Sequence, residues 1–244
     1  MEEFTDQVIL ENISLLAPTQ KFYRGAMLET KDLERCCPLD NGHHEGQEPS
    51  ASLGQLDTLP LELLQPILLD IDLKSLTVLR SVNRTFRKTI DSIKEYDDII
   101  AHAPTSLRAA LSINLGSWIS CRQLYNTLCS QECVECGSFG PFLYLLSCSR
   151  VCYICLREDQ RFLPMVPEYA KTAFKLSSQK LADLPTALSI PGRYAHSTFP
   201  QAAAGEPEGS QITNRIKLVD RSAAYKAVYM EYPSLEQLKE YVQC

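Results

Sequence analysis

The sequence predicts a mainly α-helical protein with a small cysteine-rich β/turn element, in which N-terminal helices precede an irregular α+β region. Two apolar runs with helical spacing lie between residues 56 and 90, and paired cysteines lie between residues 133 and 155. A short alternating stretch at residues 215–219 predicts a strand near the C-terminus. The helical segment is too short to bury its own apolar surface, which indicates that it forms half of an interface.

The first apolar run begins at Leu59-Pro60. Proline suits the first position of a helix, where its missing N–H would have no partner, and Glu62 follows where the helix dipole favours an anion. Pro66 removes a backbone hydrogen bond inside the run, so we expect a bend or a restart near Gln65. Apolar residues recur at helical spacing, at Leu63, Leu64, Ile67 and Leu68.

The second apolar run opens at Asp72, a residue type that caps helix N-termini. Its apolar side chains share an arc of roughly 120° on a helical wheel, a normal width for a buried face. These side chains are Leu76, Leu79, Val82, Phe86 and Ile90. Polar residues occupy the opposite side, so the run predicts a second amphipathic stretch after the first.

The two runs share a recognisable pattern over residues 56–87. It reads L-x-x-L-P-x-E-L-L-x-x-I-L, then an acidic cap, then L-x-x-L-x-x-V-N-R-x-F-R. This combination resembles an F-box. F-box proteins are substrate receptors of cullin–RING (SCF-type) ubiquitin ligases, and the box docks on a Skp-family adaptor. The alternative interpretation is an ordinary two-helix hairpin within a helical core.

The resemblance implies which residues bind the adaptor. They are Leu59, Pro60, Leu63, Leu64, Ile67 and Leu68, together with Leu76, Leu79, Val82 and Phe86, which would serve both docking and core packing. Two further motifs resemble a group of fungal F-box proteins with a cysteine-rich region after the box. One is A-P-x-x-L-R-A at residues 103–109, and the other is C-x-x-C-G-x-F-G-x-F-L-Y-L at residues 133–145.

Cys133, Cys136, Cys152 and Cys155 form the spacing C-x2-C-x15-C-x2-C, which is typical of a zinc site. Two cysteines separated by two residues in a tight turn can point both sulfurs at one ion. We therefore expect one structural zinc ion, with Cys148 as an alternative ligand. Two other interpretations stay open, namely buried thiols without metal and a redox pair.

The chain divides into four expected regions: an N-terminal extension and linker at 1–54, the F-box at 55–101, a helical and cysteine-rich region at 102–200, and a flexible segment, short strand and C-terminal helix at 201–244. Further helices are expected at 105–113 and 120–128, and a strand at 142–145. The docking face is expected to be complete before Pro104, so that a chain lacking residues 117–244 would still bind the adaptor.

Composition limits the function. A net charge of -6 over 244 residues argues against binding to nucleic-acid phosphates, which requires a basic surface. No apolar run approaches the ~20 residues that span a bilayer, so no membrane partner is expected. Ten cysteines in a chain whose N-terminus lacks a secretory pattern favour thiols or metal ligands over disulfides, and a cytoplasmic or nuclear location.

The favoured function is therefore a non-catalytic receptor that binds an adaptor, and through it a cullin, and brings an unknown protein substrate close to the ligase. A zinc-dependent or thiol enzyme is poorly supported, because the chain has no H-E-x-x-H, no G-x-S-x-G and no Gly-rich phosphate loop. A zinc-ribbon module for nucleic acid or protein is the main alternative. The aromatic residues Phe139, Phe142, Tyr144 and Tyr153 are candidates for substrate contact or for packing around the metal.

Overall fold

The computed structural model describes Leu33, Cys37 and residues 52–190, 192–193, 211–212 and 215–229. The chain divides into two compact units, one made of residues 1–32 and 190–215 and the other of residues 33–189 and 216–244. In the first unit, β4 (Gly192–Arg193) pairs antiparallel with β5 (Gln211–Ile212). Most of the predicted N-terminal extension, residues 201–210, which the sequence predicts to be flexible, and the chain beyond Tyr229 lie outside the described residues.

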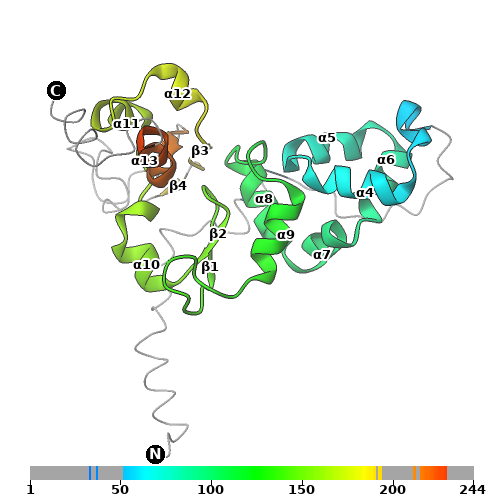
Figure 1. Ribbon diagram of the computed structural model, residues 1–244, viewed down its shortest axis with the longest axis horizontal. Coiled ribbons are helices and arrows are strands. Elements are labelled where there is room, and N and C mark those ends of the chain that lie inside the picture. Colours follow the sequence, from blue (N-terminus) through cyan, green and yellow to red (C-terminus); the bar gives the residue numbers. More distant parts are fainter. Residues whose placement is uncertain are drawn as a thin grey trace, which may run out of the picture. The chain divides into compact units, whose positions relative to one another are not determined.

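The first part of the larger unit is helical, as the sequence predicts. A short 3-10 helix, η1 (Gly54–Thr58), precedes α4 (Leu61–Asp70), α5 (Leu73–Val82), α6 (Arg84–Asp91) and α7 (Lys94–His102). Figure 1 shows these helices as short successive segments. Helix α4 continues through Pro66 without the expected restart. Pro66 is exposed, and its carbonyl accepts a hydrogen bond from the Arg122 guanidinium at 3.3 Å.

The second apolar run forms two helices rather than one, which is a correction to the helical-wheel interpretation. Asp72 caps α5 as expected, since its Oδ1 accepts a hydrogen bond from the Ser75 N–H at 2.9 Å. Asn83 then leaves the helical conformation with φ -155°, and its Oδ1 accepts from the Phe86 N–H at 2.8 Å to cap α6. The break keeps Phe86 in the core while Val82 stays exposed.

Helices α8 (Pro104–Ser112) and α9 (Cys121–Cys129) follow, and α9 packs against both α4 and α7. Leu124 of α9 is fully buried. The loop before α9 runs antiparallel to the start of α5, where the Leu73 N–H donates to the Ile119 carbonyl at 2.9 Å and the Lys74 N–H donates to the Gly116 carbonyl at 3.0 Å. The helical core is therefore completed by residues after Pro104, whereas the expectation that the docking face is complete before that proline stays a prediction.

A two-stranded hairpin comes next, with β1 (Phe142–Tyr144) antiparallel to β2 (Ser149–Val151) and Phe142 opposite Val151. Arg150 joins this hairpin to α9. Its guanidinium donates to the carbonyls of Thr127 at 3.0 Å, Leu128 at 2.9 Å and Ser130 at 3.1 Å. The last carbonyls of a helix have no partner within the helix, so a cation there both satisfies them and complements the helix dipole.

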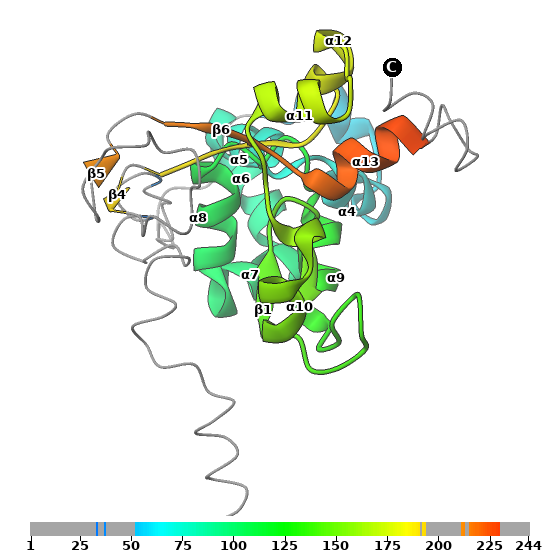
Figure 2. The same cartoon turned by 90° about the vertical axis from the view of Figure 1, so that its left-hand side faces the viewer.

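The C-terminal part of the larger unit consists of small elements, of which α10 and η2 pack with the hairpin and the later ones pack around an apolar cluster of their own. The elements are α10 (Tyr153–Glu158), η2 (Gln160–Phe162), α11 (Pro167–Ala173), α12 (Ser178–Ala182), β3 (Thr186–Leu188), β6 (Lys217–Val219) and α13 (Arg221–Tyr229). Strand β3 pairs antiparallel with β6, which leads directly into α13 (Figure 2). The buried cluster consists of Leu176, Leu184, Val219, Ala224 and Val228.

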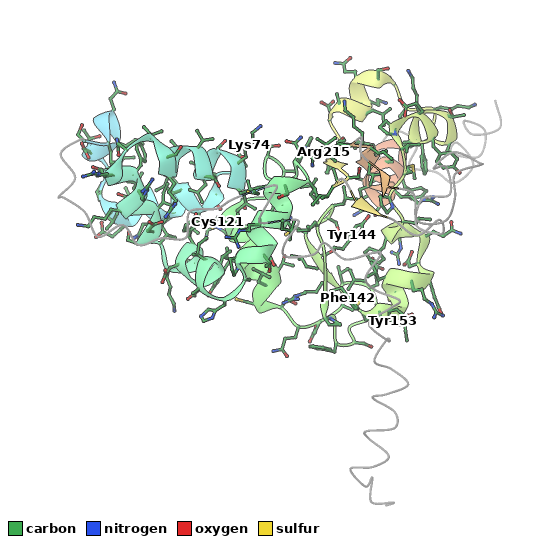
Figure 3. All side chains as sticks on the ribbon, turned by 180° about the vertical axis from the view of Figure 1, so that it is seen from behind. Lys74, Cys121, Phe142, Tyr144, Tyr153 and Arg215 are labelled. Atoms are coloured by element: carbon green, nitrogen blue, oxygen red, sulfur yellow. The ribbon has the colours of Figure 1, made fainter. Side chains whose placement is uncertain are left out.

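A buried carboxylate links this C-terminal part to the hairpin. The Tyr144 hydroxyl donates to Asp220 Oδ1 at 3.0 Å, and the Ala223 N–H donates to Asp220 Oδ2 at 2.8 Å at the start of α13. Figure 3 labels Tyr144 on the hairpin strand. Burial raises the pKa of the Asp220 carboxyl, because the charged form is poorly solvated there despite these donors.

We expect Leu124→Ala to destabilise the helical core by ~2–5 kcal/mol, because it empties a fully buried position between α9 and its neighbours. The measurement is the free energy of unfolding from urea titration. Gln123→Ala changes an exposed neighbour on the same helix and serves as the control. An unfolding free energy unchanged by Leu124→Ala would show that α9 does not belong to this core.

We expect Arg150→Met to lower the free energy of unfolding by about 2–3 kcal/mol, since it leaves the carbonyls at the end of α9 without their charged donor. Arg150→Lys should recover only part of the loss, because an ammonium cannot reach several carbonyls as a planar guanidinium does. Thermal unfolding monitored by circular dichroism would measure both variants. Equal stability of Arg150→Met and the natural chain would contradict the assignment.

Candidate functional site

The four cysteines of the predicted metal site come together in the structure. The Sγ atoms of Cys133, Cys136, Cys152 and Cys155, the thiol cluster, all lie within 4.8 Å of one another. The Cys136 and Cys152 sulfurs are 3.6 Å apart. A tetrahedral ion with Zn–S bonds of ~2.3 Å places its sulfurs roughly 3.8 Å apart, so the four side chains fit such an ion.

The first cysteine turn owes its shape to two glycines. Gly137 has φ +71°, a conformation that side chains disfavour, and its N–H donates to the Cys133 carbonyl at 2.9 Å. A Cβ atom on Gly140 would lie 3.1 Å from the backbone nitrogens of both Cys133 and Val151. The absence of a side chain at Gly140 therefore lets the turn pack directly on strand β2.

The second cysteine turn uses the start of α10. Cys152 precedes the helix, and its Sγ accepts a hydrogen bond from the Cys155 N–H at 3.4 Å. A helix N-terminus carries a partial positive charge and free N–H groups, both of which favour a thiolate. The sequence C-x-x-C thus places one sulfur at the helix cap and the other one turn later on the same side.

The surroundings of the thiol cluster favour thiolates. Burial opposes ionisation of Cys133, yet backbone N–H groups of Cys152, Cys136 and Glu135 outweigh it and lower its pKa to about 6. The Ser138 hydroxyl and N–H lower the pKa of Cys136. The pKa of Cys155 is raised, chiefly because its thiol donates a hydrogen bond to the Cys152 sulfur, and burial raises it further. Metal ions bind the thiolate form, so this set of donors suits a cation.

Other cysteines lie elsewhere. Cys148, the alternative ligand, is buried, and its Sγ contacts the Thr127 hydroxyl at 3.7 Å. Its backbone carbonyl accepts from the same hydroxyl at 2.9 Å, and burial raises the pKa of its thiol. Cys121 is fully buried at the start of α9, where burial raises its pKa to about 12. Within the described residues, the group able to hold a metal is the thiol cluster.

A second candidate site is the outer side of α4. Leu63 and Ile67 are 56% and 50% exposed, whereas Leu64 and Leu68 are buried in the core. The helix is therefore apolar on two sides, of which the core uses only one. Among the predicted adaptor-binding residues, Pro60, Leu63, Ile67 and Val82 are exposed, Leu59 and Leu79 are partly exposed, and Leu64, Leu68, Leu76 and Phe86 are buried.

Two exposed apolar residues on α4 and α5 were not predicted from the sequence. Leu61 begins α4, and Val78 lies one turn before Val82 on α5. A signal was present in each case, since an apolar residue outside the arc of the buried face is exposed in a helix of this kind. Such residues cost solubility unless a partner covers them.

Residues 56–98 match the family model of the F-box domain. The chain contains an F-box domain. The match covers η1 in part, then α4 to α6 and the start of α7, so the exposed side of α4 lies within it and the thiol cluster lies outside it. No curated protein and no solved structure matches the chain. The resemblance to fungal proteins with a cysteine-rich region after the box stays a prediction.

An F-box supports a role as an adaptor-binding subunit of SCF-type ligases, because F-box domains bind Skp-family adaptors and hence cullins. F-box proteins are typically non-catalytic. In the part of the chain that the structure describes, no helix is both long enough and apolar enough to cross a membrane.

Proposed function

We propose that this chain is the substrate-receptor subunit of an SCF-type ubiquitin ligase. The observation that supports it is the exposed apolar side of α4, at Pro60, Leu63 and Ile67, within the F-box match. Fully burying a leucine or isoleucine side chain contributes about 1.5–3 kcal/mol, so two half-exposed anchors can supply much of a docking energy. The buried residues of the same helix keep it fixed on the core while the outer residues meet the adaptor.

In this role the receptor performs no chemistry of its own. It raises the effective concentration of a substrate lysine near a charged conjugating enzyme that the adaptor and cullin bring into the same complex. The region after the F-box would hold the substrate. The ligases of this class act in the cytoplasm and nucleus, and we propose the same location for this chain.

We further propose that the thiol cluster holds one zinc ion. Four cysteine thiolates suit zinc, and they leave no coordination position for water, so the ion would be structural rather than catalytic. Cys133 and Cys136 would bind the ion from the first cysteine turn, and Cys152 and Cys155 would bind it from the start of α10. The ion would thus fix the two ends of the hairpin against each other.

A nucleic-acid role for the cysteine-rich region is disfavoured by the pairing of its arginines. Arg150 donates to backbone carbonyls, and Arg161 pairs with Glu135 and Asp159 at 2.5 Å each. Arg157 pairs with Glu158 at 2.8 Å. The cations between residues 150 and 161 are therefore engaged within the protein, and they leave no basic surface for phosphates.

Leu63→Asp and Ile67→Asp should each weaken adaptor binding by about 30-fold or more, since hot-spot side chains at a docking face contribute ~2 kcal/mol or more. Both residues are exposed, so the variants should keep the fold. The measurement is titration calorimetry with a purified Skp-family adaptor. Tyr169→Asp, an exposed aromatic on α11 outside the F-box, is the matched control. Undiminished binding by a folded Leu63→Asp, Ile67→Asp double variant would refute the docking face.

Purified protein should contain one zinc ion per chain, and Cys136→Ser should lower that content. Zinc sites in small peptides have apparent binding energies on the order of 10–16 kcal/mol, so a chelator should unfold the hairpin and expose it to protease. Cys129→Ser removes a thiol that lies outside the cluster and should leave the zinc content unchanged. Metal-free protein with a protease-resistant hairpin would contradict the proposal.

A further inference from the structure

The turn that carries Cys133 and Cys136 displays two large apolar side chains to solvent. Phe139 is 69% exposed and Val134 is 61% exposed, and no other large hydrophobic residue in the described part of the chain reaches 60%. Both belong to a turn that the cysteine ligands and Gly140 hold close to strand β2. Exposed apolar groups on a rigid support are typical of binding surfaces.

Phe139 lies at the end of this turn and Val134 at its start. Glu132 and Phe139 pair as an antiparallel bridge, and the Cys133 N–H donates to the Ser138 carbonyl at 2.7 Å between them. Cys133 is buried, whereas Glu132, Val134 and Phe139 are exposed to solvent. Phe139 stands opposite Glu132 in the bridge. We call Glu132, Val134 and Phe139 the turn face.

The backbone of this turn is held in place, so it cannot fold over its own apolar side chains. The Gly140 N–H donates to the Gln131 carbonyl at 2.8 Å, which fastens the base of the turn. Gly140 then packs against the backbone of Cys133 and Val151, with no room for movement toward the strand. A surface held in this way loses little conformational entropy on binding, which is the advantage of preorganisation.

The charge of the turn face is negative. Glu132 is exposed and makes no ion pair within the described residues. The nearest cations are engaged, because Arg161 pairs with Glu135 and Asp159, and Arg150 donates to carbonyls at the end of α9. An apolar pair beside one free carboxylate is complementary to an apolar segment that carries a lysine or an arginine.

The other aromatic candidates for substrate contact already make contacts within the protein or are partly buried. Tyr144 donates to Asp220, and its ring packs edge-on against Phe162 with centroids 5.1 Å apart. The Tyr153 ring lies under the Arg157 guanidinium at 5.5 Å. Phe142 is partly buried in β1. Figure 3 shows Phe142, Tyr144 and Tyr153 on the hairpin and at the start of α10. Phe139 is thus the aromatic side chain of this set that is left for a partner.

We propose that the turn face binds the substrate polypeptide, through a short segment in which aliphatic or aromatic side chains flank a lysine or an arginine. The inference rests on the proposed receptor function and names the class of segment recognised. Phe139 and Val134 supply the apolar contact, and Glu132 selects the cation.

The test selects short random displayed peptides against the full-length, zinc-loaded chain. The selected peptides should be rich in aromatic or aliphatic residues next to lysine or arginine. Phe139→Ser should weaken the binding of the selected peptides by about tenfold or more, as expected for an apolar hot spot. Glu132→Lys should reverse the preference toward peptides that carry aspartate or glutamate. Ile154→Ser changes another exposed apolar residue, on α10, and should leave binding unchanged.

Zinc content and adaptor affinity are measured for every variant, so that loss of the fold or of the F-box interaction is seen separately. Peptide binding that survives Phe139→Ser and Glu132→Lys would overturn the inference, as would a selection that yields no binder or only acidic peptides. Specific peptide binding without adaptor binding would instead contradict the receptor function and keep the turn face as a binding site.

Discussion

The guanidinium of Arg150 connects helix α9 to the hairpin that precedes Cys152. Arg150 lies in strand β2, and its guanidinium donates to the carbonyls at the end of α9. Two residues later the chain reaches Cys152 of the thiol cluster, and at its other end α9 packs on α4 of the F-box. The position of the cysteine turns relative to α9 thus depends on the Arg150 guanidinium, together with the Thr127 hydroxyl that donates to the Cys148 carbonyl at 2.9 Å.

Helix α4 shows how a short helix can pack on a core and still expose a second apolar side. Leu64 and Leu68 face inward and fix the helix to α6 and α9, whereas Leu63 and Ile67 remain exposed. The bidentate contact of Arg122 with Asp70, with Nε–Oδ1 at 2.5 Å, holds the end of α4 from outside the F-box match. The proposed docking surface is therefore oriented by residues that the family pattern does not contain.

Local signals in the sequence predicted much of this fold. Asp72 and the paired cysteines act through neighbours a few residues away, so their spacing was sufficient to predict a helix cap and a four-thiol cluster. The break at Asn83 was also local, because asparagine caps helices, but the continuous apolar arc concealed it. The role of Arg150 depends on carbonyls about 20 residues away, and no local pattern encodes that contact.

The central claim is that the exposed side of α4 is the surface that receives the adaptor, while the cysteine turns stay free for another partner. Hydrogen exchange of the full chain, with and without a Skp-family adaptor, tests it directly. The account predicts that the adaptor slows exchange in residues 59–70 and leaves the backbone amides of residues 132–155 unchanged. Protection confined to the cysteine turns, with α4 exchanging as in the free chain, would contradict it.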